Sequence, residues 1–178
     1  MRRKLLPVFF AALCIATVPV VAQGPPDPRP AIEAVKQVAF LEGNWSGEGW
    51  AQMGPGPREG FTQTETVELK LDGAVMLIEG VGYSKGENPK KVHHALAVVS
   101  FDPAGNSLVF SSFLPGRPRL DVVPEVAPNA FKWGFSPTGG GQIRYSIAVE
   151  GGTWHEVGEY SRDGESWHQF FEMQLTKE

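Results

Sequence analysis

The sequence predicts an all-β protein: a single up-and-down antiparallel β-barrel of about ten strands with one short N-terminal helix. Three observations lead to this prediction. After residue 43 apolar and polar residues alternate in short runs, which is the period of half-buried strands. Asp-Gly, Gly-Gly and similar turn sequences separate these runs and are typical of hairpins. Apolar residues recur at helical spacing in only one stretch of the domain, 31–41. A two-sheet sandwich is the alternative arrangement.

The residues before the domain have the features of a signal peptide. A basic head at 2–4 precedes an apolar stretch at 5–21, which ends in Val-Val-Ala, a sequence with small residues where signal peptidase cleaves. An uncleaved membrane anchor is the alternative, because the stretch is nearly long enough to span a bilayer. Pro7, Pro19 and the cleavage-like end favour removal. We therefore expect a signal peptide at 1–22 and a protein that is secreted or periplasmic.

Charge and cysteine content exclude several functions. Three of the 16 Lys and Arg lie in the expected signal peptide, so 13 remain against 20 Asp and Glu, a net charge of −7. An acidic chain without basic clusters argues against nucleic acid and, after signal cleavage, against membranes as partners. Cys14, the single cysteine, would be removed, which excludes disulfides and thiolate metal sites. A Pro-rich linker at 23–30 then precedes one domain at 31–178.

Each element of the domain follows from its pattern. Ile32, Val35, Val38 and Leu41 recur at helical spacing and predict one helix over 31–41. Alternating runs bounded by turn residues predict the strands. Their expected ranges are 45–53, 61–71, 74–83, 92–101, 107–114, 119–123, 130–135, 142–149, 153–160 and 166–176.

The turn at Asp72-Gly73 sets the register of the first hairpin. A two-residue turn there places the following pairs on one face: Leu69–Met76, Val67–Ile78, Glu65–Gly80 and Gln63–Gly82. Glu65 and Gln63 thus face glycines, which leave room where a core would otherwise be filled.

Two further turns, Gly151-Gly152 and Asp163-Gly164, align three strands in the same way. They predict an inner face that carries Val149, Ile147, Ile143, Trp154, Tyr160, Trp167, Phe171 and Met173. The opposite face carries complementary charges, with Arg144, Glu159 and His168 in one row and Ala148, His155 and Glu172 in another. Glu156 falls on the inner face between Ile147 and Phe171, and Tyr145 and Gln169 flank Gly158 one row away.

A carboxylate on an inner face must be paired, protonated or open to a wet cavity, because burying it alone is costly. We therefore expect an interior cavity that binds a small apolar or amphipathic ligand. The candidate lining residues are Glu156, Tyr145, Gln169, Trp154, Phe171, Glu65 and Gln63. A structural polar cluster, or a barrel end where the interior meets solvent, would give the same pattern.

The first strand carries the motif "GNWSGEG" at 43–49. A large aromatic side chain between permissive glycines suits a plug at one barrel end, which we assign to Trp45. The motif resembles the signature of the calycin group, which includes lipocalins and fatty-acid-binding proteins. Its longer form is similar to the nitrobindin branch of heme-binding barrels and to related secreted bacterial proteins. The resemblance continues weakly through 64–80, 93–110 and the final strand.

The nitrobindin resemblance implies heme as an alternative ligand. There a His near the start of the last strand binds iron, and this position corresponds to His168 or Phe170. The predicted register places both on the outer face, which favours no cofactor. His93 and His94 are adjacent on a strand and point to opposite faces, so they do not grip one metal, and His155-Glu156 lacks the second His of a zinc helix. We expect no metal site.

Catalysis has little support in the sequence. It contains no nucleophile elbow, phosphate loop or dinucleotide fingerprint. Glu156 and Tyr145 could act as an acid–base pair, but no motif specifies a substrate. A ligand-binding barrel is therefore the leading hypothesis. A structural or interaction domain with a filled interior is the second, and an isomerase or hydrolase built on the cavity is the third.

Overall fold

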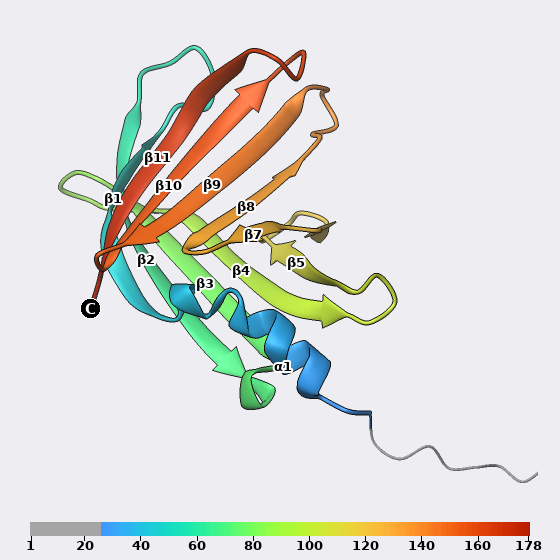
Figure 1. The fold of residues 1–178 in the computed structure, drawn as a ribbon. Coiled ribbons are helices and arrows are strands. Elements are labelled where there is room, and N and C mark those ends of the chain that lie inside the picture. Colours follow the sequence, from blue (N-terminus) through green and yellow to red (C-terminus); the bar gives the residue numbers. More distant parts are fainter. Residues whose placement is uncertain (1–25) are drawn as a thin grey trace, which may run out of the picture.

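The computed structural model describes residues 26–178, which form one curled antiparallel sheet with a helix at one end (Figure 1). Within this part of the chain the sheet has eleven strands in the order β6-β5-β4-β3-β2-β1-β11-β10-β9-β8-β7. The strands are β1 (Gly43–Ala51), β2 (Glu59–Lys70), β3 (Val75–Ser84), β4 (Lys91–Asp102), β5 (Ser107–Phe113), β6 (Leu120–Val122), β7 (Glu125–Ala127), β8 (Ala130–Phe135), β9 (Gln142–Glu150), β10 (Thr153–Ser161) and β11 (Trp167–Lys177). The predicted all-β, up-and-down architecture is confirmed.

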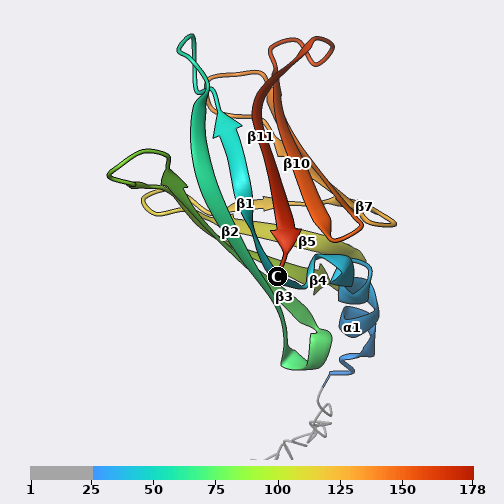
Figure 2. The same ribbon diagram turned by 90° about the vertical axis from the view of Figure 1, so that its left-hand side faces the viewer.

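The two ends of the sheet are much shorter than its other strands. β6 pairs only with β5, and β7, which the sequence did not predict, pairs only with β8. The sheet is therefore a half-barrel: it curls until β6 lies against β8, but the hydrogen-bonded ladder does not close between β6 and β7. Figure 2 shows the curvature of the sheet from a second direction.

The predicted helix is divided in two. Helix α1 (Arg29–Lys36) is followed by a separate 3-10 turn, Ala39–Leu41. The linker was expected to end at residue 30, but α1 already begins at Arg29 and includes Pro30. Proline is favoured in the first turn of a helix. Of the four residues expected to face the core, Val35, Val38 and Leu41 are fully buried, and Ile32 in the first turn is half-buried.

One end of the half-barrel is covered by α1 (Figures 1 and 2), which contacts β3, β4 and β5. Trp45 lies at this end and is 1% exposed. Its indole Nε1 donates a hydrogen bond of 2.8 Å to the Leu41 carbonyl. Its ring meets that of Trp154 edge to face, with centroids 5.6 Å apart. No helix from residues 26–178 lies at the opposite end, where the 52–58, 85–90 and 162–166 loops are found.

Two of the three predicted hairpin registers are confirmed. Glu65 lies opposite Gly80 and Gln63 opposite Gly82 in the β2–β3 hairpin. In the β9–β10 hairpin, the residues opposite Ile147 and Tyr145 are Glu156 and Gly158. These residues, and those at every second position along the same strands, define the inner face of the sheet.

The third register, between β10 and β11, was predicted wrongly. Trp154 lies opposite Leu175, where Met173 was expected. Glu156 lies opposite Met173, where Phe171 was expected, so the register differs by two residues. The connection is not a two-residue Asp-Gly turn. Asp163 accepts hydrogen bonds from Ser161 Oγ and from the backbone N–H groups of Glu165 and Ser166, and so closes a longer loop. A bulge between Gly158 and Glu159 shifts the pairing again above it.

The expected signal peptide at 1–22 lies outside the described residues. Within 26–178, no helix has both the length and the apolar composition needed to cross a membrane.

Candidate functional site

Three polar side chains are buried together on the inner face. Gln63 is 3% exposed, Glu65 7% and Glu156 8%. Gln63 Nε2 donates to Glu65 Oε1 at 2.7 Å, and the indole Nε1 of Trp154 donates to Glu156 Oε2 at 3.2 Å. We call these four residues the inner cluster. All four were predicted to line the interior, and their strands, β2 and β10, lie on either side of β1 and β11.

Two glycines make room for the inner cluster. A Cβ atom on Gly80 would clash with both carboxyl oxygens of Glu65, and one on Gly82 would clash with Gln63 Oε1. The two polar side chains therefore lie across the bare backbone of β3. This agrees with the argument from sequence that glycines opposite inward polar residues leave space.

The pKa values of both carboxyls in the inner cluster are raised. Burial raises the pKa of Glu65 from its usual 4.5 to about 7, although the hydrogen bond from Gln63 lowers it. Burial and the charge of Glu65 raise the pKa of Glu156 to about 8, against the lowering effect of the Trp154 hydrogen bond. Burial, then the charge of Glu156, raises the pKa of Tyr145. Two neighbouring carboxyls of this kind titrate together and hold at least one proton at neutral pH.

One polar atom of the inner cluster has no partner. Gln63 Oε1 is buried and accepts no hydrogen bond from the described residues. Buried polar atoms are nearly always paired, and an unpaired one is costly, so this oxygen marks a place where a donor from outside the chain would be stabilising.

Aromatic rings form a wall beside the inner cluster. The Tyr145 ring stacks on Trp133 with centroids 4.5 Å apart and meets the rings of Phe170 and Phe171 edge to face. Phe171 in turn stacks on Phe61 at 5.7 Å. Tyr145 and Phe171 were predicted to be here. Phe61, Trp133 and Phe170 were missed, although Phe61 alternates with Gln63 and Glu65 along one strand and could have been found.

The sequence placed Gln169 in the cavity, and the structure does not. Gln169 lies opposite Glu159, is exposed, and donates a hydrogen bond to Glu172 at 3.1 Å on the outer face. The bulge between Gly158 and Glu159 is the cause, because it shifts the pairing of β11 by one residue. Phe170 therefore contacts Tyr145, and His168 lies opposite Tyr160 rather than on the outer face as predicted.

His93 lies on the same face of the sheet as the inner cluster. His93 lies opposite Gly82 on the inner face, yet its side chain is accessible to solvent. Partial desolvation by the surrounding protein, and then the charge of His94, lowers the pKa of His93. Accessibility together with desolvation is expected for a group inside an open hollow. The outer-face residues His94 and His155 instead bond to Glu79 and Glu172.

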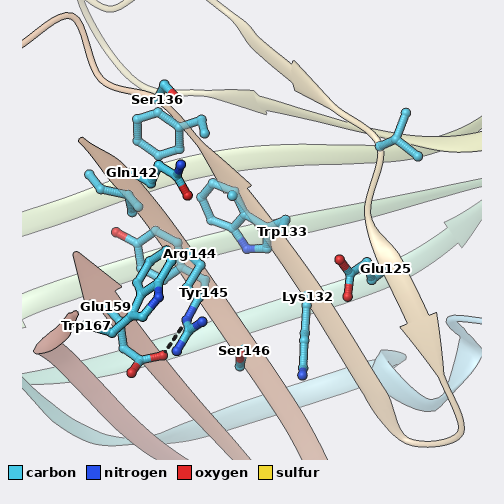
Figure 3. Close-up of a pocket in the computed structure, with 14 residues that line it drawn as sticks. Glu125, Lys132, Trp133, Ser136, Gln142, Arg144, Tyr145, Ser146, Glu159 and Trp167 are labelled. Carbon is cyan, nitrogen blue, oxygen red and sulfur yellow. Dashed lines mark hydrogen bonds and ion pairs between the residues drawn. The ribbon is translucent and has the colours of Figure 1, made fainter. Parts of the chain in front are cut away.

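A separate groove of about 720 Å³ lies along β8 and β9 (Figure 3). Arg144 crosses it, donating to Glu159 at 2.7 Å and stacking its guanidinium 3.8 Å from the Trp167 ring centroid. Tyr145 is the only predicted cavity residue among those that line it, and the two buried carboxyls lie outside it. Arg144 and Glu159, the charged groups named here, are already paired with each other.

Among residues 26–178, no group of three or more His, Cys, Asp or Glu side chains is placed to hold a metal ion. Comparison with protein-family models finds no match, and neither does comparison with curated proteins. Among solved structures, the chain is similar to the crystal structure of Rv2717c from M. tuberculosis. The TM-score is 0.60 at 10% sequence identity, over 82% of this chain and 97% of the other. At this identity the similarity concerns the fold alone, and it supports the barrel-like architecture.

Proposed function

We propose that this protein is a secreted or periplasmic barrel of the calycin type that binds a small apolar or amphipathic ligand in its interior. One observation carries the proposal: Gln63, Glu65 and Glu156 are buried on the inner face of the sheet, beside an aromatic wall. Apolar walls with a few polar groups that fix orientation are typical of ligand sites.

A filled structural interior would not need this arrangement. Burying two carboxyls and an unpartnered amide oxygen destabilises the fold, and apolar residues of similar size would pack there at less cost. The presence of these three polar side chains in the interior is explained if they bind a ligand. In this proposal the inner cluster binds the polar end, while Tyr145, Phe171 and Phe61 contact the apolar part.

Titration with the uncharged fluorophore N-phenyl-1-naphthylamine tests the proposal. We expect saturable binding and enhanced emission. Ala95 lies on the inner face opposite Gly80, so Ala95→Phe should fill the hollow and weaken binding by about tenfold or more, the effect of losing a well-packed apolar contact. Leu96→Phe adds bulk on the exposed outer face of the same strand and is the matched control. Absence of saturable binding, or equal affinity in Ala95→Phe, would favour the structural-domain hypothesis.

Heme is a second candidate, favoured by the bulge in β11. Because of the bulge, His168 lies opposite Tyr160, a residue of the inner face, where its imidazole could bind heme iron. The side chain is exposed, and aromatic rings lie nearby on β9 and β11. The residues present fit such a group: His168 would hold the iron, and the Tyr145–Phe170 wall would contact the porphyrin. Bound heme would supply a redox-active iron centre.

Absorption spectroscopy tests the heme candidate. Protein incubated with hemin and desalted should show a Soret band, which His168→Ala should abolish and His94→Ala, on the outer face, should leave unchanged. A Soret band that persists in His168→Ala would assign the ligand elsewhere and contradict this candidate.

A further inference from the structure

The amide and indole N–H donors of the inner cluster are already directed to its own carboxyls. Gln63 Nε2 is directed to Glu65, and the Trp154 indole N–H is directed to Glu156. Gln63 Oε1 is buried without a partner among the described residues, and Glu65 and Glu156 each carry a second carboxyl oxygen besides the one that accepts from Gln63 or Trp154. Gln63 Oε1 accepts in any protonation state of the carboxyls, so whatever occupies this site must present a donor to it.

We propose that the inner site selects ligands in which an ammonium group is attached to an apolar body, with the ammonium bound by Gln63 Oε1, Glu65 and Glu156. This inference rests on the proposed function and specifies the chemical class of its ligand.

The number and charge of the acceptors favour an ammonium over other donors. An ammonium carries three N–H donors, which matches three acceptor groups on two strands. A hydroxyl has one donor and would leave two of the acceptors without one. A carboxylate ligand would meet two acidic groups and an acceptor oxygen.

Binding of an ammonium also changes the protons held by the site. The carboxyls titrate near neutral pH because each is buried without a cation. A bound ammonium lowers the pKa of both carboxyls, so a proton leaves a carboxyl for the solvent as the ion pair forms. A neutral alcohol supplies no such charge, so its binding should release no proton. Proton release on binding therefore distinguishes an ammonium ligand from a neutral alcohol with the same apolar body.

Calorimetry with three eight-carbon probes tests the inference: octylamine, 1-octanol and sodium octanoate, each titrated into the mature chain at pH 7. We expect octylamine to bind at least about tenfold more tightly than octanol, the value of a charge-assisted hydrogen bond, and octanoate to bind most weakly. Repetition in two buffers of different ionisation enthalpy should show proton release for octylamine only.

Three substitutions test which residues cause the preference for octylamine. Gln63→Leu removes the unpartnered oxygen, and the preference for octylamine over octanol should fall to about threefold or less. Glu156→Gln removes one of the two titrating carboxyls, so it should reduce both the proton release and the preference for octylamine, and it is the second variant if Gln63→Leu does not fold. Glu79→Gln is the matched control, because Glu79 adjoins Gly80 but lies on the exposed outer face, paired with His94. It should retain the full preference.

The outcomes separate this inference from the function on which it rests. If octanol or octanoate binds as tightly as octylamine, and Ala95→Phe weakens that binding, the cavity stands and the ammonium selectivity is wrong. If none of the three probes binds and N-phenyl-1-naphthylamine does not bind either, the proposed function is wrong and the inference falls with it. An octylamine preference unchanged in both Gln63→Leu and Glu156→Gln would also overturn it.

Discussion

Trp45 joins the helical segment to the sheet through both its polar and its apolar atoms. Its N–H is bonded to the Leu41 carbonyl and its ring packs on Trp154, with 1% of the residue exposed. Trp45→Ala should therefore lower the free energy of unfolding by about 3–5 kcal/mol, the range for truncating a large buried aromatic. Urea denaturation measures the change. Trp50→Ala, at a partly exposed tryptophan of the same strand, should cost clearly less, and an unchanged midpoint for Trp45→Ala would contradict the plug assignment.

Glu65 and Glu156 should make stability depend on pH. Their pKa values are raised from 4.5 to about 7 and about 8, so between pH 4.5 and 8 the folded state binds more protons than the unfolded state. Stability contributed by the protonated carboxyls is then present below pH 4.5 and is lost as pH rises through 8. Thermal unfolding from pH 4.5 to 9 measures this decline.

Glu65→Gln and Glu156→Gln should each flatten the decline, because the amide does not ionise. Glu79→Gln, on the outer face, should not. A wild-type stability that stays constant or rises over this pH range would show that the two carboxyls are ionised in the folded protein without cost.

Gly158 lies where the bulge begins and where the aromatic wall comes closest to β10. A Cβ atom there would lie 2.8 Å from Tyr145 Cε1 and 3.0 Å from Phe171 Cβ. Gly158→Val should cost about 1–3 kcal/mol, as overpacking of a core usually does, and should displace Tyr145. Gly139→Ala is the control, since a Cβ there meets open space. Equal stability of both variants would show that the Tyr145–Phe171 contact does not depend on the missing side chain.

The predictability of the candidate site depended on the turns that connect its strands. Asp72-Gly73 and Gly151-Gly152 fixed the registers of their hairpins, so Glu65, Gln63 and Glu156 were placed correctly from alternation alone. Asp163 was assigned to a tight turn, but its carboxylate caps a longer loop, and the bulge then moved Gln169 outward and Phe170 inward. Neither the loop length nor the bulge has a local signal in that stretch, because both depend on how β11 packs against β1 and β10.

At the scale of the whole molecule, alternation with turn residues was sufficient to predict an antiparallel sheet with strands in chain order. The sequence did not predict β7, because three residues are too few for a period to be visible. The closeness of Glu65 to Glu156 was also beyond prediction, since it arises from the curvature of the entire sheet. Strand order can be deduced from local pattern, whereas curvature is set by contacts between strands far apart in sequence.

Cleavage of the expected signal peptide is a prediction about the whole chain. The mature protein should begin near Gln23 and be recovered outside the cytoplasm, because the basic head, the apolar stretch and Val-Val-Ala fit a cleaved signal. N-terminal sequencing of the protein purified from the expressing cell measures this. An intact Met1 in a membrane fraction would contradict the prediction and favour the anchor alternative.

The gap between β6 and β7 has a consequence for self-association. A curled sheet with free ends exposes backbone N–H and C=O groups that could recruit a strand from another copy of the chain. Here each free end is a strand of only three residues, and Pro124, which has no N–H to offer, follows Val123 between them. Such short edges, interrupted by proline, provide poor templates for strand addition. The short β6 and β7 edges therefore disfavour edge-to-edge polymerisation through these two strands.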